Sequence, residues 1–116
     1  MTQNPFSIGH KPVPISQARV EGIGVNPLDA RRIDVAVDLT PCQQTLRLEM
    51  AIVGPDDQEW SSITIVHNRQ WMIDKIMHFR RDALPGEYVL HVGLFDDQEL
   101  VHHARKRFVV PPPQDP

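Results

Sequence analysis

The sequence predicts an all-β fold class, a seven-stranded antiparallel β-sandwich. Apolar and polar residues alternate along most of the chain, which is the pattern of strands with one dry face and one wet face. Residues that favour turns separate these segments about every 8 to 12 residues, as they do in sandwiches. The chain has 116 residues, of which 41% are hydrophobic, enough for one hydrophobic core and therefore one domain.

Two predicted strands carry the alternation most clearly. In residues 32–39 every odd-numbered side chain is apolar, so we expect that face to be buried. In residues 45–53 the even-numbered side chains are apolar and should point inward, whereas Arg47 and Glu49 should point outward. The other expected strands cover residues 15–23, 60–66, 71–79, 84–95 and 99–110.

The segment 71–79 alternates poorly, because Lys75 interrupts an apolar row. A β-bulge near Asp74 and Lys75 would switch the face of the residues that follow it and restore the row. We therefore expect a bulged strand here, with a helix as the alternative assignment.

A leucine and a Pro-Gly turn precede Tyr88 in the segment 84–92, whose sequence is LPGEYVLHV. This segment resembles the approach to strand F in fibronectin type III and bacterial immunoglobulin-like domains. The resemblance implies an immunoglobulin-like β-sandwich in which the Tyr88 hydroxyl donates to upstream backbone, an arrangement called the tyrosine corner. The chain departs from immunoglobulin domains proper in lacking a cysteine pair, and from fibronectin domains in its shorter turn. The resemblance implies no particular function, because such sandwiches host many unrelated ones.

Proline-rich segments flank the predicted sandwich. We expect residues 1–14 to form an extended arm, residues 15–110 to form the sandwich, and residues 111–116 to form a disordered tail. Cys42 is the single cysteine of the chain, which excludes an intramolecular disulfide. The N-terminus lacks the pattern of a signal peptide and no apolar run approaches the length of a membrane span. We therefore expect a cytoplasmic protein with no membrane partner.

The charge balance argues against nucleic acid as a partner. The net charge is −3, which gives no field that would attract a polyanion. The basic run 102–107, together with Arg80 and Arg81, could contact phosphates locally. Strand alternation, however, sends neighbouring charges of that run to opposite faces. A charged edge strand that resists edge-to-edge pairing accounts for the run without a ligand.

Histidines on the last two predicted strands raise the question of a metal site. His91 could face His102 or His103 across the final hairpin, and such a pair could bind zinc or copper. A metal site needs three or four converging ligands, and no cysteine or carboxylate joins the pair in the pattern. We predict solvent-facing imidazoles, no metal ion and no cofactor, with a His-based metal-binding domain as a distant alternative.

The sequence contains no catalytic motif. Gly22 and Gly24 lack the third glycine and the helix of a phosphate-binding loop. Cys42 has no basic neighbour that would stabilise a thiolate. The aspartate pairs at 56–57 and 96–97 fit turns, with a calcium site as a weaker alternative. We predict that the protein is not an enzyme.

The candidate interaction surface consists of Trp60, Ser62 and Thr64. If Ile63 and Ile65 face the core, alternation places those three side chains on the outer face. Exposed aromatic residues mark interfaces and sugar-stacking platforms. The alternative is that Trp60 begins its strand and folds over the end of the core.

The predicted function is a non-catalytic protein-interaction module, with self-association as a homodimer as one form of it. A carbohydrate-binding accessory β-sandwich, with Trp60 as its platform, is the alternative. The two functions differ in what contacts the surface.

Overall fold

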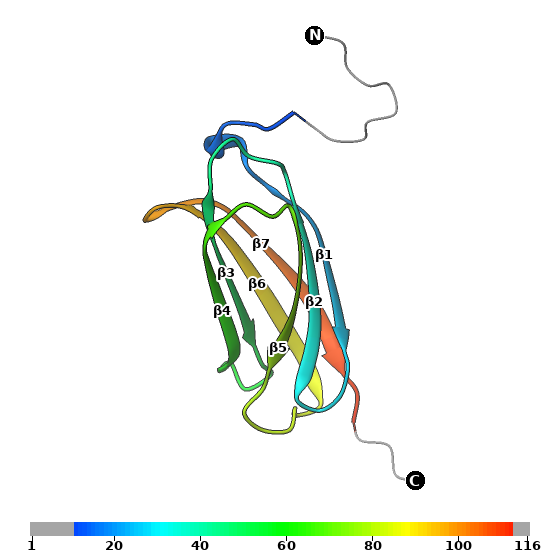
Figure 1. The fold of residues 1–116 in the computed structure, drawn as a ribbon. Helices are drawn as coiled ribbons and strands as arrows, with labels where there is room; N and C mark the ends of the chain where they lie inside the picture. The colour runs from blue at the N-terminus through cyan, green and yellow to red at the C-terminus, as the bar shows by residue number, and fades with distance from the viewer. Residues whose placement is uncertain (1–10, 113–116) are drawn as a thin grey trace, which may run out of the picture.

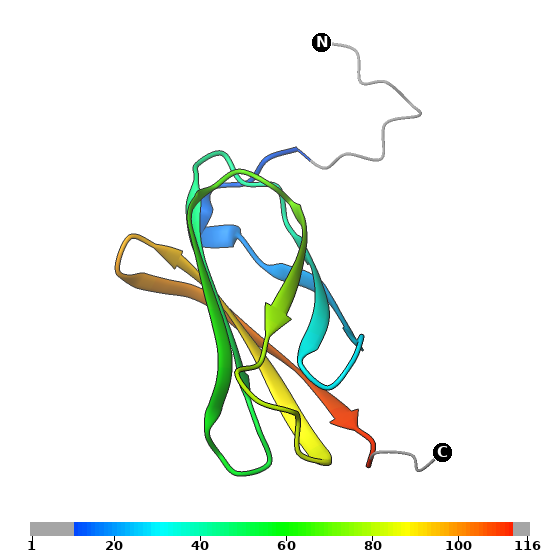
Figure 2. The ribbon, with the colours of Figure 1, turned by 60° about the horizontal axis from the view of Figure 1, so that its bottom comes forward.

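The computed structural model describes residues 11–112, which form two antiparallel β-sheets packed face to face (Figures 1 and 2). One sheet has the strand order β1-β2-β5 and the other has the order β4-β3-β6-β7. The seven-stranded antiparallel β-sandwich predicted from the sequence is confirmed. The strands are β1 (Val20–Pro27), β2 (Arg32–Leu39), β3 (Leu46–Val53), β4 (Glu59–Asn68), β5 (Met72–His78), β6 (Gly86–Asp96) and β7 (Glu99–Val110).

The core lies between the sheets, and strand alternation decides which side chains enter it. The odd-numbered residues of β2 and the even-numbered residues of β3 are buried, as predicted. Burial of each aliphatic side chain of this size contributes about 1.5–3 kcal/mol, so these rows are the main source of stability. The buried residues of β2, β3 and β6 are Ile33, Val35, Val37, Leu39, Leu46, Leu48, Met50, Ile52, Tyr88, Leu90, Val92, Gly93 and Leu94.

Tyr88 braces the turn that leads into β6. Its hydroxyl donates to the Leu84 carbonyl oxygen at 2.8 Å, which confirms the predicted hydrogen bond to upstream backbone. Its ring is fully buried and stacks between Phe79 and Phe108, with centroid distances of 5.6 and 5.5 Å. The phenol therefore packs in the core while its one polar atom keeps a partner.

The first strand begins later than predicted. Residues 15–17 form a 3-10 turn, η1 (Ile15–Gln17), and β1 then continues to Pro27. Pro27 is tolerated at the end of β1 because β1 is an edge strand, where a missing backbone N–H costs no ladder bond. The prediction of a strand over residues 15–23 was wrong at its start and too short at its end.

The predicted bulge in the fifth strand is wrong, and so is the helix alternative. β5 pairs with β2 in an unbroken register, in which Lys75 lies opposite the buried Val35. Lys75 thus belongs to the inward row with Ile73 and Met77 but remains exposed. It can do so because β5 is an edge strand, where a long side chain reaches water past the end of the core.

A bulge lies instead at Trp60, in β4. Ile52 pairs with Ser61 and its neighbour Val53 pairs with Glu59, so Trp60 is the extra residue between them. An extra residue changes the face on which side chains lie. The predicted outward orientation of Trp60 is therefore wrong: the indole is 7% exposed and belongs to the core, as the alternative interpretation had it.

The N-terminal part of the described chain pairs with the connection between β2 and β3. Val13 donates its N–H to the Pro41 carbonyl and accepts from Gln43, with both bonds at 2.9 Å. The neighbouring Cys42 is buried. Residues 1–10 of the predicted arm and residues 113–116 of the predicted tail lie outside the described residues. Over 11–112, no helix is long and apolar enough to cross a membrane.

Candidate functional site

The outer face of the four-stranded sheet carries Ser62 and Thr64, two of the three predicted surface residues. Both side chains are exposed, as predicted, and both line a shallow groove of about 530 Å³. Strand pairing extends the row sideways: Thr64 lies beside Glu49, which lies beside Gly93, which lies beside His103. The groove therefore crosses all four strands of this sheet.

Gly93 lies at the floor of this groove, where the lack of a side chain leaves space. A Cβ atom there would lie 2.9 Å from Phe95 Cε2, so the Phe95 ring occupies space that a larger residue would need. The Arg47 guanidinium lies over the same ring, 4.5 Å from its centroid, in a cation–π contact. Leu100, which is 54% exposed, lines the groove next to Phe95. Phe95 and Leu100 make this end of the groove apolar, whereas polar and apolar side chains are mixed along the rest of it.

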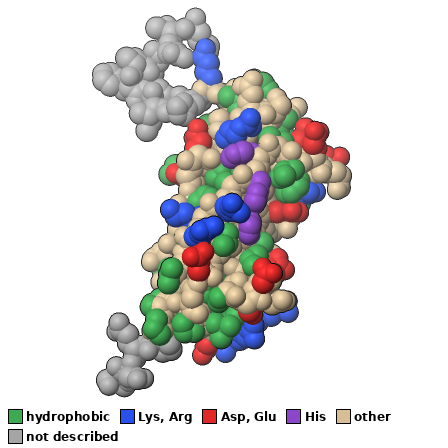
Figure 3. All heavy atoms as spheres, turned by 180° about the vertical axis from the view of Figure 1, so that it is seen from behind, with side chains coloured by type: hydrophobic (Ala, Val, Ile, Leu, Met, Phe, Trp, Pro, Cys, Tyr) green, Lys and Arg blue, Asp and Glu red, His purple; other side chains and the backbone are tan. Residues whose placement is uncertain are grey.

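Two histidines form the other wall of the groove. His91 Nδ1 and His103 Nε2 are 3.0 Å apart, and their rings stack in parallel with centroids 5.2 Å apart. The residue directly opposite His91 is Arg105, so the two histidines meet diagonally. Figure 3 shows histidine side chains gathered beside lysine and arginine side chains on this face. Within residues 11–112 no group of three or more metal-ligating side chains is present, so the pair lacks further ligands.

The environment of His91 favours its neutral imidazole. Burial lowers the pKa of His91, and the neighbouring His103 and Arg105 lower this pKa further. An N···N separation of 3.0 Å requires one ring to donate its N–H and the other to accept, so the two cannot both be protonated while the bond exists. The pair is a hydrogen-bonded structural feature of the face that depends on pH.

His102 faces the opposite direction from its neighbour. Its Nδ1 accepts a hydrogen bond from the Val20 backbone N–H at 2.9 Å, which joins β7 to the start of β1. Burial lowers the pKa of His102, with smaller contributions from Arg19 and His103. His102 therefore closes one seam between the sheets and does not belong to the groove.

Trp60, the third predicted surface residue, occupies the opposite seam, where β4 lies near the end of β5. Its indole N–H donates to Asp56 Oδ1 at 2.8 Å, and its ring packs edge-on against Phe79 and Tyr88. The Arg81 guanidinium covers the ring at 4.3 Å from the centroid and reaches Asp56 Oδ2 at 3.1 Å. Because core residues and Arg81 cover the indole, it offers no open platform for a sugar ring.

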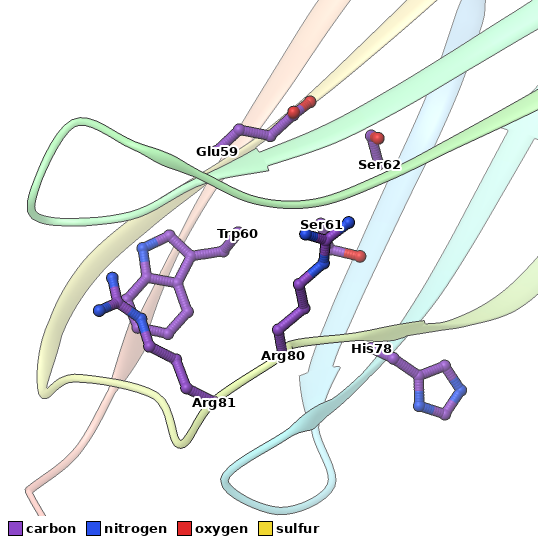
Figure 4. A pocket seen from close by; sticks show the side chains of 7 residues that line it. All are labelled: Glu59, Trp60, Ser61, Ser62, His78, Arg80 and Arg81. Carbon is purple, nitrogen blue, oxygen red and sulfur yellow. The ribbon is translucent and has the colours of Figure 1, made fainter.

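A cleft of about 720 Å³ opens at this seam (Figure 4). Four consecutive residues of β4 line it from one side, and the end of β5 and the loop after it line it from the other. Because of the bulge, Trp60 and Ser61 lie on one side of β4 while Glu59 and Ser62 lie on the other, so a cleft that touches all four wraps around the strand's free edge. The lining residues are Glu59, Trp60, Ser61, Ser62, His78, Arg80 and Arg81.

The sequence did not predict this cleft, although it contained one signal. Arg80 and Arg81 were recognised as part of a basic patch together with residues 102–107, but β5 and β7 lie in different sheets. The outward arginines of β7 line an edge strand, as predicted, while Arg80 and Arg81 follow β5 and face β4. The adjacency of β4 and β5 across the seam is a tertiary feature with no local pattern.

The predicted aspartate turns are present and have structural roles. Asp57 and Asp97 adopt positive φ angles of 62° and 54°, which aspartate tolerates in turns. Asp56 is held by Trp60, Gln58 and Arg81. The hydrogen bond from Trp60 is the main reason that the pKa of Asp56 lies below its ordinary value. Asp56 thus acts as a charged acceptor within the fold.

Comparison with known proteins finds fold neighbours but no family. No family model and no curated protein match the sequence. Similar solved structures include a β-glucuronidase from Bifidobacterium dentium, with 16% identity and a TM-score of 0.64 over 80% of this chain and 18% of that chain. A glycosyl hydrolase family 2 member from Bacteroides cellulosilyticus has 14% identity and a TM-score of 0.62 over 79% and 14%. A β-glucuronidase from Ruminococcus gnavus has 9% identity and a TM-score of 0.57 over 81% and 16%.

These likenesses show the fold alone, because the identities are low. The chain spans less than a fifth of the length of each of these enzymes. The matched segments are therefore β-sandwich parts of much larger chains.

Proposed function

We propose that this protein is a non-catalytic interaction module that packs against a folded domain of a carbohydrate-acting protein. The contact surface is the outer face of the four-stranded sheet, with Ser62 and Thr64 in β4 and His91 and His103 in β6 and β7. The single observation that carries the proposal is the groove across this face, which combines polar side chains with the apolar Phe95 and Leu100 at one end.

The composition of the groove supports a domain-type contact. Contacts between domains are more polar than obligate interfaces and combine hydrogen-bonding groups with a smaller apolar centre. Leu100 is 54% exposed and Val66, on the same strand as Thr64, is 62% exposed, so a partner would remove apolar surface from water. The fold likeness supports the choice of a carbohydrate-acting partner. In each similar enzyme the matched segment is only 14% to 18% of a longer chain, so a β-sandwich of this kind occurs there as one part of a larger carbohydrate-acting protein.

A site-specific photo-crosslinker tests the proposed surface. Placed at Thr64 in cells that produce the protein, it should capture one defined partner, whose purified domain should then bind the protein in solution. The same crosslinker at Asn26, exposed on the three-stranded sheet, should capture nothing defined. Leu100→Glu should weaken the reconstituted binding about tenfold, since it buries an unpaired charge. Equal capture from Asn26, or unchanged binding by Leu100→Glu, would sink the proposal.

The proposal of a non-catalytic role rests on the carboxylates at the seam cleft. Glycoside hydrolysis uses two carboxyl groups that flank the bond. Glu59 is the one carboxylate among the residues that line the seam cleft, and Asp56 beside it is engaged with Trp60 and Arg81. Purified protein should therefore release no product from chromogenic glycosides, and turnover abolished by Glu59→Gln would contradict this.

Direct carbohydrate binding is a second candidate function, and the seam cleft favours it. The cleft combines hydroxyl, carboxylate, imidazole and guanidinium groups, which match the mixed donors and acceptors of a sugar. Trp60 would lie beneath the site, covered by Arg81, and not serve as its platform. A glycan array tests this candidate, and absence of signal for both neutral and acidic glycans would remove it.

A further inference from the structure

The two arginines of the seam cleft differ in what they already contact. Arg81 bonds to Asp56 and covers Trp60, so its charge is compensated within the fold. Arg80 is exposed and makes no ion pair or side-chain hydrogen bond within residues 11–112. Figure 4 shows its side chain extending from the loop after β5 toward β4, and Ser61 lines the same cleft. Arg80 therefore presents an uncompensated guanidinium to the cleft, with the Ser61 hydroxyl as a further donor among the lining residues.

A guanidinium with a nearby hydroxyl suits a planar oxyanion. Arginine binds a carboxylate through two parallel hydrogen bonds, and a hydroxyl group can donate a third. Arg81, although paired with Asp56, adds positive charge to the same cleft. The charged group that this part of the cleft accepts is therefore an anion.

The rest of the cleft accepts neutral polar groups. Glu59 and Ser62 lie on the opposite side of β4 from Arg80 and Ser61 (Figure 4). The Glu59 carboxylate can only accept hydrogen bonds, so it favours hydroxyl donors and repels a second anion. β4 is an edge strand, so half of its backbone N–H and C=O groups face outward without a neighbouring strand among the described residues. These groups also match hydroxyls.

We propose that the seam cleft binds an acidic sugar of the uronic acid class. Its carboxylate lies against Arg80 and Ser61, and its hydroxyls meet Glu59, Ser62 and the free edge of β4. Glu59 disfavours a ligand with several negative charges, such as an acidic peptide or a phosphate dianion, but favours a ligand with one carboxylate and several hydroxyls. The inference deepens the second candidate function, on which it rests. It shares Glu59 and Ser62 with the groove of the proposed docking face, whereas Arg80 and Ser61 line the seam cleft and not that groove.

Titration of the ¹⁵N-labelled protein with sodium glucuronate tests the inference. Glucuronate should shift the amide signals of Ser61 and Ser62 and the Arg80 side-chain signal, while glucose at the same concentration should leave them unchanged. Arg80→Gln should weaken binding about tenfold, the range expected for loss of a bidentate pair. Arg69→Gln is the matched control: it removes the same charge from the loop before β5, whereas Arg80 lies in the loop after it, and it should change the affinity less than about twofold.

Other ligands in the same titration test which chemical groups of glucuronate cause the shifts. Acetate, inorganic phosphate or a glutamate tripeptide that reproduced the shifts with equal affinity would overturn the inference, because the hydroxyls would then contribute nothing. Shifts that map elsewhere, or binding unaffected by Arg80→Gln, would also overturn it. An array on which neutral glycans bind and acidic ones do not would keep carbohydrate binding and reject the uronic acid.

Discussion

The Trp60 indole N–H donates to Asp56 Oδ1 at 2.8 Å, and this bond ties the β3–β4 turn to the bulge that turns Trp60 inward. The same carboxylate accepts from the Gln58 backbone N–H and from Arg81. One aspartate thereby holds the turn, the buried indole and an arginine of the seam cleft in place. The relationship predicts that Asp56 matters for stability although it lies in an exposed turn.

Asp56→Ala should destabilise the protein, because it leaves a buried indole N–H without its acceptor. The urea midpoint should fall, whereas Asp57→Asn, its matched control in the same turn, should leave the midpoint unchanged since asparagine tolerates a positive φ. The hydrogen bond from Trp60 is the main reason that the pKa of Asp56 lies below its ordinary 3.8. The stabilisation is therefore present above about pH 3.8 and is lost as the pH falls through the lower folded value. Equal midpoints for Asp56→Ala and Asp57→Asn would contradict the assignment.

Gly54→Ala should be among the most destabilising conservative changes in the chain. A Cβ atom at Gly54 would overlap with the Trp60 indole, which must then leave its place against Phe79 and Tyr88. Overpacking of this kind costs about 1–3 kcal/mol. At Gly24 a Cβ atom would meet only Ala36 Cβ at 3.8 Å, so Gly24→Ala should stay within about 0.5 kcal/mol of the native protein. Thermal unfolding of both variants measures the difference, and similar values would mean that the indole is not packed over Gly54.

Tyr88→Phe should cost about 1–2 kcal/mol, because the Leu84 carbonyl loses its buried donor. Chemical unfolding monitored by tryptophan fluorescence measures the change, and a neutral substitution would show that the hydrogen bond contributes nothing.

The same tyrosine should also resist ionisation. Burial raises the pKa of Tyr88 above its ordinary 10.0. Because the pKa of Tyr88 is higher in the folded state than in the unfolded state, its neutral hydroxyl contributes stability that is fully present below pH 10. This contribution is lost as the pH rises through the folded pKa. Tyr88 is the single tyrosine, so phenolate absorbance in an alkaline titration reports it alone. Absorbance should rise above pH 10 and together with unfolding; a midpoint at or below 10 would count against burial of the hydroxyl.

The His91–His103 pair should make the outer face of the four-stranded sheet sensitive to pH. The pKa of His91 lies below its ordinary 6.5, mainly through burial. Because the pKa of His91 is lower in the folded state, neutral His91 contributes stability that is present above pH 6.5. This contribution is lost as the pH falls through the folded pKa. In an NMR titration His91 should therefore titrate below 6.5. His103→Ala should raise the His91 pKa, since it removes one of the neighbours that lower that pKa, and His78→Ala, a change at an exposed histidine of β5, should not. A His91 midpoint unaffected by His103→Ala would refute the coupling.

Most of the strands could be predicted from alternation because each face of a strand meets one environment. The rows of β2 and β3 lie between the sheets or toward water along their whole length, so a period of two remained visible. Glu99–Val110 was predicted with the bounds that the structure has. The resemblance of the segment around Tyr88 implied a hydrogen bond from its hydroxyl to upstream backbone, and the structure identifies the acceptor as the Leu84 carbonyl. This bond could be expected because both partners lie within one short segment.

The errors occurred where pairing between strands, and not local pattern, places a side chain. The bulge at Trp60 depends on how β4 pairs with β3, and no sequence pattern within residues 60–66 indicates it. Lys75 needs no bulge because β5 is an edge strand, which a single segment cannot reveal.

The sequence by itself determined the fold class, the faces of the central strands, and the exposure of Ser62 and Thr64, because a period of two needs only local geometry and the choice between water and core. Only the tertiary structure decided that Trp60 points inward, that His91 meets His103 diagonally, and that Arg80 faces β4 across the seam. Each of these depends on register or on the packing of one sheet against the other. Such distances join residues far apart in the chain, and no spacing along it encodes them.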